Sequence, residues 1–280
     1  MAILSRVSLE PRTLTPQTPA NPICFGHRGA RGHAPENTLL AFDLAFDLGA
    51  DGVECDAQIS ADGKVVIIHD STVNRTTNGR GKVTDLSFEE LRALDAGRLM
   101  RIPQRIPTLE ETLALVWRRG GRLNVELKAD TEQDAIAVAE AVAPILNAIP
   151  ASDHLRDCIL ISSFKLASLT RMRKLTPWER LGALYGGRGW TRTTMIETAR
   201  KLGVDAIHPH PRIVTDETVR AAHDAGLSVN VWTANRLATI RQLLAWGVDG
   251  VFTDFPERVV TLRRLASVPG AGREAGDRTE

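Results

Sequence analysis

The sequence is poor in cysteine, in aromatic residues and in charge of one sign. Three cysteines (Cys24, Cys55 and Cys158) occur among 280 residues, each inside an apolar run. An odd number without paired spacing argues against a disulfide framework and predicts small, reduced core residues. There is a single tyrosine, and 35 basic residues balance 34 acidic ones for a net charge of +1. The basic surface that nucleic-acid binding needs is therefore not expected, and nor is a nucleic-acid partner.

Long hydrophobic runs are also missing. Residues 1–22 hold Pro, Thr and Ser but no apolar stretch of the roughly 7–15 residues that a secretory signal needs. A membrane span would need about 18 or more apolar residues. We expect residues 1–21 to form a flexible arm and residues 267–280, rich in Gly, Arg and Glu, to form a disordered tail. The sequence thus predicts a cytoplasmic protein without a stable membrane anchor.

Between these ends, short apolar runs alternate with segments of helical apolar spacing. The strands are expected at 23–26, 53–59, 123–127, 158–162, 181–185, 206–208, 227–232 and 250–253. Each of these eight strands is followed by a helix, which is typical of an α/β fold and predicts a parallel (β/α)₈ barrel over residues 22–266 as one domain. A doubly wound open sheet is the alternative, but no Gly-rich nucleotide fingerprint follows the first strand.

One strand does not fit the parallel pattern. Residues 65–68 return after the tight turn Ala61-Asp62-Gly63, and a turn this short favours an antiparallel hairpin. We therefore expect this strand to lie outside the barrel and to lead into a small insertion over about residues 71–107. Capping boxes at Ser87-x-x-Glu90 and Thr108-x-x-Glu111 predict helix starts within and just after it.

Carboxylates interrupt two of the predicted strands. Side chains two apart on a strand point the same way, so Glu54 and Asp56 share a face, as do Asn124, Glu126 and Lys128. In a barrel, chemistry lies at the carboxyl ends of the strands, where three carboxylates would meet. Such charges repel unless a cation lies between them, and oxygen ligands favour Mg²⁺ or Ca²⁺. The alternative is a set of surface charges on strand edges.

Histidines and cations end other apolar runs. His27 and His69 suit an acid–base pair because imidazole titrates near neutral pH. Arg28 and Lys128 suit phosphate oxygens, or ion pairs with the acids just named. Trp232, at the end of the seventh strand, suits an apolar part of a substrate or barrel-top packing. We expect His33 and His223 to face solvent, and His208 and His210 to have no function, since no partner acid stands at ligand spacing.

These residues stand in motifs that follow one another in a known order. The chain resembles the glycerophosphodiester phosphodiesterases over about residues 23–260. Each motif alone is weak, whereas the ordered set is specific. The motifs are His27-Arg28-Gly29-Ala30, residues 34–38, Glu54-Cys55-Asp56, residues 66–70, Asn74-Arg75-Thr76-Thr77, residues 106–110, Glu126-Leu127-Lys128, Val231-Trp232-Thr233 and residues 250–254.

The resemblance implies a TIM-barrel hydrolase with a small insertion after the hairpin strand. It implies one divalent cation, Mg²⁺ or Ca²⁺, held by Glu54, Asp56 and Glu126, with acid–base histidines at His27 and His69. It further implies that Arg28 and Lys128 contact the phosphate and Trp232 the glycerol side. The substrates implied are small glycerophosphodiesters, which yield glycerol 3-phosphate and an alcohol.

Several alternatives stay open at this point. The same site on a lipid would make a lysophospholipase D-like phosphodiesterase, although no amphipathic lipid-binding helix stands out. A barrel that binds a phosphate ester without turnover is the alternative of another class. Which histidine is the acid, and whether water or the glycerol 2-hydroxyl attacks first, are not determined by the sequence. The metal, the head group and the oligomeric state are likewise left open.

Overall fold

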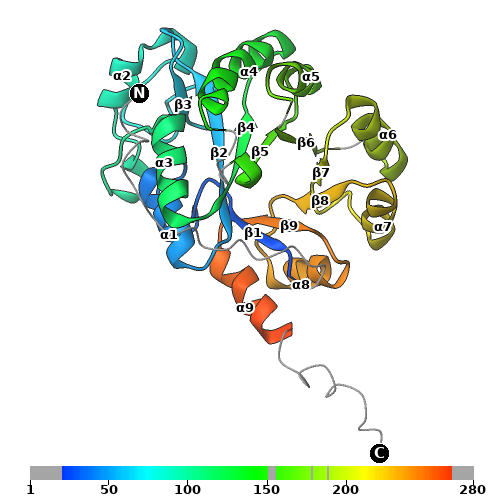
Figure 1. Ribbon diagram of the computed structural model, residues 1–280. Helices are drawn as coiled ribbons and strands as arrows, with labels where there is room; N and C mark the ends of the chain where they lie inside the picture. Colours follow the sequence, from blue (N-terminus) through cyan, green and yellow to red (C-terminus); the bar gives the residue numbers. More distant parts are fainter. Residues whose placement is uncertain (1–20, 151–155, 178, 188, 267–280) are drawn as a thin grey trace, which may run out of the picture.

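The strands form a closed ring with the helices on its outside (Figure 1). This arrangement is described by a computed structural model for residues 21–150, 156–177, 179–187 and 189–266. The strands are β1 (Ile23–Gly26), β2 (Gly52–Ile59), β3 (Val65–Ile67), β4 (Arg122–Leu127), β5 (Ile159–Ser163), β6 (Arg180–Tyr185), β7 (Ala206–Pro209), β8 (Ser228–Val231) and β9 (Gly250–Thr253).

The main helices lie between consecutive barrel strands, except the last, which follows β9. They are α1 (Leu39–Asp47), α2 (Phe88–Ala93), α3 (Leu109–Arg119), α4 (Glu132–Asn147), α5 (Leu166–Leu175), α6 (Arg192–Leu202), α7 (Asp216–Asp224), α8 (Leu237–Ala245) and α9 (Pro256–Ala266). Short 3₁₀ turns occur at η1 (Val83–Asp85), η2 (Arg98–Met100) and η3 (Arg156–Cys158). A large apolar core fills the space between the strands and the helices.

The sheet order is β1-β9-β8-β7-β6-β5-β4-β2-β3, and a further pairing of β1 with β2 closes the ring. All pairings within the ring are parallel, and β3 alone pairs antiparallel, with β2. Leaving out β3, eight of the nine strands in this sheet build the barrel. The predicted parallel (β/α)₈ barrel is therefore confirmed, and the open sheet is excluded.

The strand β3 carries the chain out of the barrel into the predicted insertion. Between β3 and α3 the chain forms η1, α2 and η2, which pack on a second, smaller apolar cluster. Val66 and Ile68 of the hairpin and Leu91 of α2 belong to this cluster. The insertion therefore has a core of its own beside the barrel, and it leaves β2 free to pair with β1 and β4.

The barrel interior is filled below its carboxyl end. Phe25 and Phe252 stack with ring centroids 4.8 Å apart, and the ring of His208 lies 5.3 Å from that of Phe252. His208 is fully buried and its Nε2 lies 3.1 Å from the Asn230 side-chain amide. The barrel is thus a packed column rather than a pore, as is usual for this architecture.

The first strand and the last helix are joined at the amino-terminal end of the barrel, opposite the carboxyl ends of the strands. Arg263 of α9 donates a hydrogen bond of 2.9 Å to the Pro22 carbonyl and pairs with Asp51. Asp51 in turn accepts a 2.8 Å bond from the backbone N–H of Cys24 in β1. The last helix is therefore fastened to the starts of β1 and β2.

A few expected boundaries are wrong by one residue. The strand expected at 158–162 begins at Ile159, because Cys158 closes the 3₁₀ turn η3, although this cysteine is buried and reduced as predicted. The strand expected at 227–232 ends at Val231, so Trp232 opens the following loop. The predicted arm and tail lie outside the described residues, apart from Asn21. The limits 22–266 for one domain stay a prediction.

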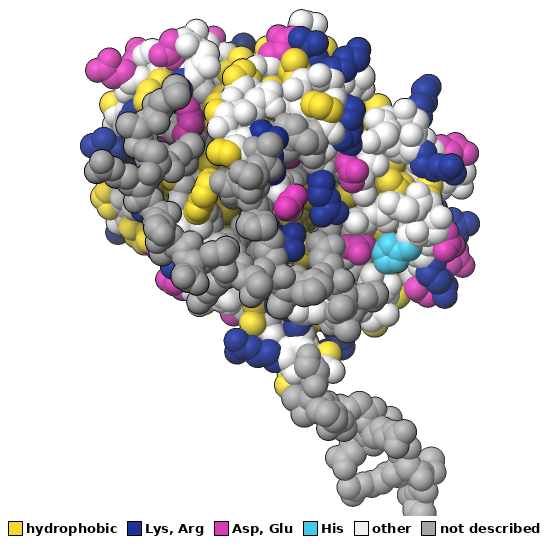
Figure 2. Space-filling model, viewed as in Figure 1, with side chains coloured by type: hydrophobic (Ala, Val, Ile, Leu, Met, Phe, Trp, Pro, Cys, Tyr) yellow, Lys and Arg dark blue, Asp and Glu magenta, His cyan; other side chains and the backbone are white. Residues whose placement is uncertain are grey.

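The surface carries mixed charge. Figure 2 shows Lys and Arg side chains interspersed with Asp and Glu over the face in view, as the balanced composition predicts. In the described parts of the chain, no helix combines the length and the apolar character that crossing a bilayer requires.

Candidate active site

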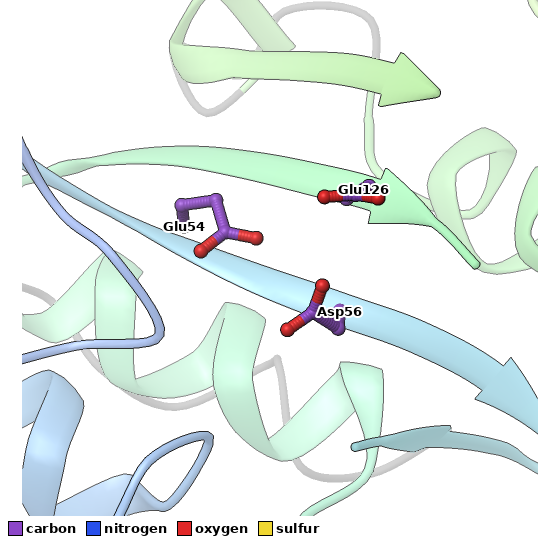
Figure 3. A group of neighbouring side chains, drawn as sticks. All are labelled: Glu54, Asp56 and Glu126. Carbon is purple, nitrogen blue, oxygen red and sulfur yellow. The ribbon is translucent and has the colours of Figure 1, made fainter. Parts of the chain in front are cut away.

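Three carboxylates meet at the carboxyl end of two neighbouring strands (Figure 3). Glu54 and Asp56 come from β2 and Glu126 from β4, and the register pairs Asp56 with Glu126. One oxygen from each lies within 4.8 Å of the others. All three residues are buried, with Asp56 only 1% exposed. The convergence predicted from the i, i+2 spacing is therefore present.

Burial and mutual repulsion act on these carboxylates. Burial, then the charges of Asp56 and Glu126, raise the pKa of Glu54. Burial likewise raises the pKa of Glu126 to about 7, against the lowering effect of Lys128. Burial would also raise the pKa of Asp56, but the positive charges of Arg28 and Lys128 outweigh it and lower that pKa.

The same three groups suit a hard divalent cation. Glu54 Oε1 is buried and accepts no hydrogen bond within the described chain. A buried carboxylate oxygen without a partner is unfavourable, and a cation would satisfy it while neutralising the repulsion. An all-oxygen ligand set is the kind that Mg²⁺ and Ca²⁺ prefer. The residues present therefore fit the group that the sequence implied.

Two cations line this cluster. The backbone N–H of Arg28 donates a 2.8 Å bond to Glu54 Oε2, which the left-handed backbone of Arg28 (φ 52°) makes possible. Arg28 Nε lies 3.3 Å from Asp56 Oδ2. Lys128 Nζ lies 2.9 Å from Glu126 Oε1 and 3.9 Å from Asp56 Oδ1. The ion pairs considered for Arg28 and Lys128 are thus real, and both side chains stand at the rim of the cluster.

Asn37 holds Asp56 from the side of the β1–α1 loop. Its Nδ2 donates a 2.7 Å bond to Asp56 Oδ2, and its Oδ1 accepts from the Asp56 backbone N–H at 3.3 Å. Asn37 adopts a left-handed conformation (φ 56°), which asparagine tolerates better than most residues. The next residue, Thr38, caps α1 by accepting from the Ala41 N–H. The start of α1 therefore positions a metal-ligand candidate.

His27 follows β1 and is supported by Asp254, the residue directly after the last barrel strand, β9. Its Nδ1 lies 2.7 Å from Asp254 Oδ1. Because the pKa of Asp254 is lowered and an ionised carboxylate only accepts, the His27 Nδ1–H is the donor. Asn235 donates to Asp254 Oδ2 at 2.7 Å and accepts from the Asp254 backbone at 2.8 Å. His27 is thus oriented with Nε2 as its second nitrogen.

His69 is oriented in the same way from the other side of β2. Its Nδ1–H donates to Asp70 Oδ1 at 2.7 Å, and its Nε2 accepts from Lys128 Nζ at 3.1 Å. The Gln58 amide donates to the carbonyls of Ile68, His69 and Asp70 and so fixes this loop. Burial lowers the pKa of both His27 and His69, which favours the neutral imidazoles.

Trp232 is half-buried and belongs to an apolar wall. Its Nε1–H donates to the His208 carbonyl at 2.7 Å. Its ring meets Phe164 and His210 edge-on, with centroids 5.0 Å and 5.6 Å away. Phe164 is 38% exposed, and Lys128 Nζ lies 5.7 Å from its centroid. The wall therefore borders the charged cluster and offers an apolar contact next to it.

The sequence-predicted residues are thus gathered at one end of the barrel, but their supports were missed. The supports are carboxylates, amides and one arginine: Glu36, Asn37, Gln58, Asp70, Arg75, Asn235 and Asp254. Asp254 directly follows β9 and Asp70 comes three residues after β3, and this place near a strand end could have identified them. The supports in loops have no periodic pattern that would show them.

Comparisons with known proteins agree with this geometry. The model of the "Glycerophosphoryl diester phosphodiesterase family" matches residues 27–258. A glycerophosphodiester phosphodiesterase of Caldanaerobacter subterraneus is 34% identical over 248 residues, which cover 86% of this chain and 98% of that protein. One from Bacillus altitudinis is 37% identical over 247 residues, covering 85% and 97%.

A solved structure adds a ligand to the comparison. It is an Oleispira antarctica phosphodiesterase in complex with the product sn-glycerol-3-phosphate, with a TM-score of 0.79 and 31% identity over 86% of this chain and 96% of that one. Because the family model covers most of the chain and several relatives exceed 30% identity, this chain belongs to the glycerophosphoryl diester phosphodiesterase family, whose members are phosphoric diester hydrolases.

Proposed function

We propose that this protein hydrolyses small glycerophosphodiesters to sn-glycerol 3-phosphate and an alcohol, with one divalent cation. The observation that carries the proposal is the buried cluster of Glu54, Asp56 and Glu126, whose oxygens lie within 4.8 Å of one another beside two carboxylate-supported histidines. The product bound by the Oleispira antarctica relative supports the glycerol 3-phosphate half of the substrate.

Glu54, Asp56 and Glu126 would hold the cation, Mg²⁺ or Ca²⁺. When bound, it would supply positive charge to the phosphate and to the negative charge that develops in the transition state. Arg28 and Lys128, already at the rim of the cluster, would bind the phosphate oxygens, Arg28 by its planar fork and Lys128 as a point charge. Trp232 and Phe164 would pack on the apolar part of the substrate.

His27 and His69 would move the protons. Each histidine donates its Nδ1–H to a carboxylate, so Nε2 is the nitrogen that would transfer a proton. His69 Nε2 accepts from Lys128 Nζ at 3.1 Å, and Lys128 would release it on binding the phosphate. One histidine, neutral at the start, would accept the proton of the attacking hydroxyl. The other would enter the reaction protonated and give its proton to the leaving alkoxide. Either water or the glycerol 2-hydroxyl can act as the attacking group in this scheme.

The test is release of glycerol 3-phosphate from glycerophosphocholine and glycerophosphoethanolamine by purified protein. We expect no release in EDTA and restored release with Mg²⁺ or Ca²⁺. Failure with every ion, from protein shown to be folded, would contradict the proposal and favour a lysophospholipid substrate or a binding role. Cell fractionation would test the cytoplasmic location, which stays a prediction from the sequence.

The acid–base assignment has its own variants. His27→Ala and His69→Ala should each lower kcat by about 10²-fold or more, since proton transfer by a positioned group contributes about 10²–10⁴-fold. The matched control is His223→Ala, because His223 is exposed and bonds Asp249 at the opposite end of the barrel. If both site variants kept wild-type turnover while folded, the assignment would be wrong.

A further inference from the structure

Arg75 lies in the loop that follows β3, and its guanidinium forms two forks. Nε and Nη2 donate to the two oxygens of Asp70 at 2.6 Å and 3.0 Å. Nη1 and Nη2 donate to the two oxygens of Glu36 at 2.9 Å and 2.7 Å. Bidentate pairs of this kind fix the relative orientation of the partners as well as attracting them. Arg75 therefore sets the positions of two carboxylates at once.

Each of these carboxylates holds a residue of the candidate site. Asp70 accepts from the Nδ1–H of His69, so its position sets the direction of the imidazole. Glu36 accepts from Arg28 Nη1 at 2.8 Å, and Arg31 Nε lies 3.1 Å from its other oxygen. Through Glu36 and Asp70, Arg75 thus connects a proton-transfer residue to a phosphate-binding one.

The guanidinium has little left for a substrate. Four of its five N–H directions are engaged by Asp70 and Glu36, and both of its donor edges are covered. Glu36 is itself mostly buried, with 9% of its side chain exposed. Burial acts to raise the pKa of Glu36, but the bonds from Arg75 and Arg28 prevail and lower it to about 2. The bridge is therefore ionised throughout the neutral range.

We propose that Arg75 is a positioning residue that locks His69 and Arg28 into one unit through Asp70 and Glu36. The inference rests on the proposed function and deepens it. It assigns the insertion a part in the reaction, since Arg75 comes from its first loop. The residue acts through its two carboxylate partners and does not touch the substrate.

The first test compares Arg75→Ala and Arg75→Lys with wild type on glycerophosphocholine at saturating Mg²⁺ or Ca²⁺. We expect kcat to fall about 10–100-fold, the effect typical of partners that orient ligating or reacting groups, while KM changes less than about threefold. Lysine should not restore kcat, because a point charge cannot make both forks. Unchanged kcat in both variants would overturn the proposal.

The matched control is Arg92, another arginine of the insertion. Its Nη1 and Nη2 donate to the two carboxylate oxygens of Glu111 at 2.7 Å and 2.6 Å. Nη1 also donates to the Ile106 carbonyl, away from the site residues. Arg92→Ala should lower Tm but leave kcat within about twofold. Equal losses of kcat in Arg75→Ala and Arg92→Ala would mean that Arg75 only stabilises the insertion, and would overturn the proposal.

A double-mutant cycle tests the route of the effect. In a background of Glu36→Gln and Asp70→Asn, both partners have lost their charge. Arg75→Ala should then lower kcat by less than about threefold further. A further fall as large as in the wild-type background would show that Arg75 acts by another route, and the proposal would fail.

A readout without turnover separates this inference from the proposed function. The hydrogen-bonded Nδ1–H of His69 gives an imidazole proton resonance, which is assigned by its loss in His69→Gln. We expect it to shift or broaden in Arg75→Ala and to stay in place in Arg92→Ala. If wild type hydrolyses no glycerophosphodiester, the proposed function fails, and this resonance alone decides the inference: an unmoved resonance overturns it.

Discussion

Glu54 has opposite effects on folding without metal and on binding of a cation. Its carboxylate is buried next to two others, so its charge opposes folding in the metal-free protein. The same charge would be a ligand when a cation is bound. A residue kept for stability would not be placed this way, because a buried carboxylate with an unbonded oxygen is unfavourable. The site is therefore built at the expense of the metal-free fold.

Glu54→Gln should reverse the two effects. The pKa of Glu54 is raised on folding, so its ionised form opposes folding at a pH above the unfolded value, and the cost grows as pH rises. In EDTA at pH 8 we expect the variant to be more stable than wild type by about 1 kcal/mol or more, the scale of the cost of a buried polar group without a partner. With cation at about 100 Kd, wild type should gain about 2.7 kcal/mol and the variant much less.

Thermal unfolding in EDTA and in Mg²⁺ or Ca²⁺ measures the stability difference between wild type and variant without and with the cation. The control is Glu140→Gln, since Glu140 is an exposed acid of α4 that pairs with Arg171. It should change stability by less than about 0.5 kcal/mol in either condition. A Glu54→Gln protein that is less stable than wild type in EDTA would argue against a cation site here.

At the scale of elements, the capping box predicted at Thr108 starts α3 and joins it to the hairpin. Thr108 Oγ1 accepts from the Glu111 N–H, and Glu111 Oε2 accepts from the Thr108 N–H. Thr108 also bridges to Val66, and the Pro107 carbonyl accepts from the Ile67 N–H. The cap therefore closes the insertion against β3 as well as beginning a helix.

Thr108→Ala should lower the free energy of unfolding by about 1–2 kcal/mol. The variant loses the N-cap hydroxyl, which accepts a hydrogen bond from the Glu111 N–H in the first turn of α3. Chemical denaturation would measure this. Thr170→Ala is the control: Thr170 is exposed inside α5, where alanine is the better helix former, so stability should stay level or rise slightly. Equal losses in the two variants would show that the cap is not the cause.

The helices and strands were predictable because each has a hydrophobic period or is bounded by turn or capping residues. The strands expected at 23–26 and 250–253 have the observed bounds, and the short turn at Gly63 correctly gave β3 its antiparallel direction. The three carboxylates were predictable from spacing along two strands. The bond between Arg75 and Glu36 was not, since these loop residues stand 39 apart and only the folded path brings them together.

At the scale of the whole molecule, one buried acid outside the site affects stability. Glu179 lies just before β6 and is 1% exposed, and neither carboxylate oxygen accepts a hydrogen bond from the described residues. Burial raises its pKa to about 9, against the lowering effects of Arg156 and Arg173. The folded protein thus keeps a proton that the unfolded chain releases near pH 4.5.

The free energy of unfolding should therefore fall as pH rises from about 4.5 towards 9, by up to about 1.4 kcal/mol per pH unit from this group. Glu179→Gln should remove that slope and stabilise the protein by more than about 1 kcal/mol at pH 8, but by less at pH 5. Denaturation at the two pH values measures the difference. The same stabilisation at both would contradict the pKa of about 9.

The bond between His27 and Asp254 spans 227 residues, almost the length of the barrel. A chain growing on the ribosome makes His27 long before it makes Asp254. Until β9 emerges, β1 also lacks one of its two neighbouring strands. The hydrogen bond from Arg263 to the Pro22 carbonyl cannot yet form either. The order of synthesis therefore delays the contact between His27 and Asp254 until the barrel is nearly closed, so an unfinished chain lacks the carboxylate that orients this imidazole.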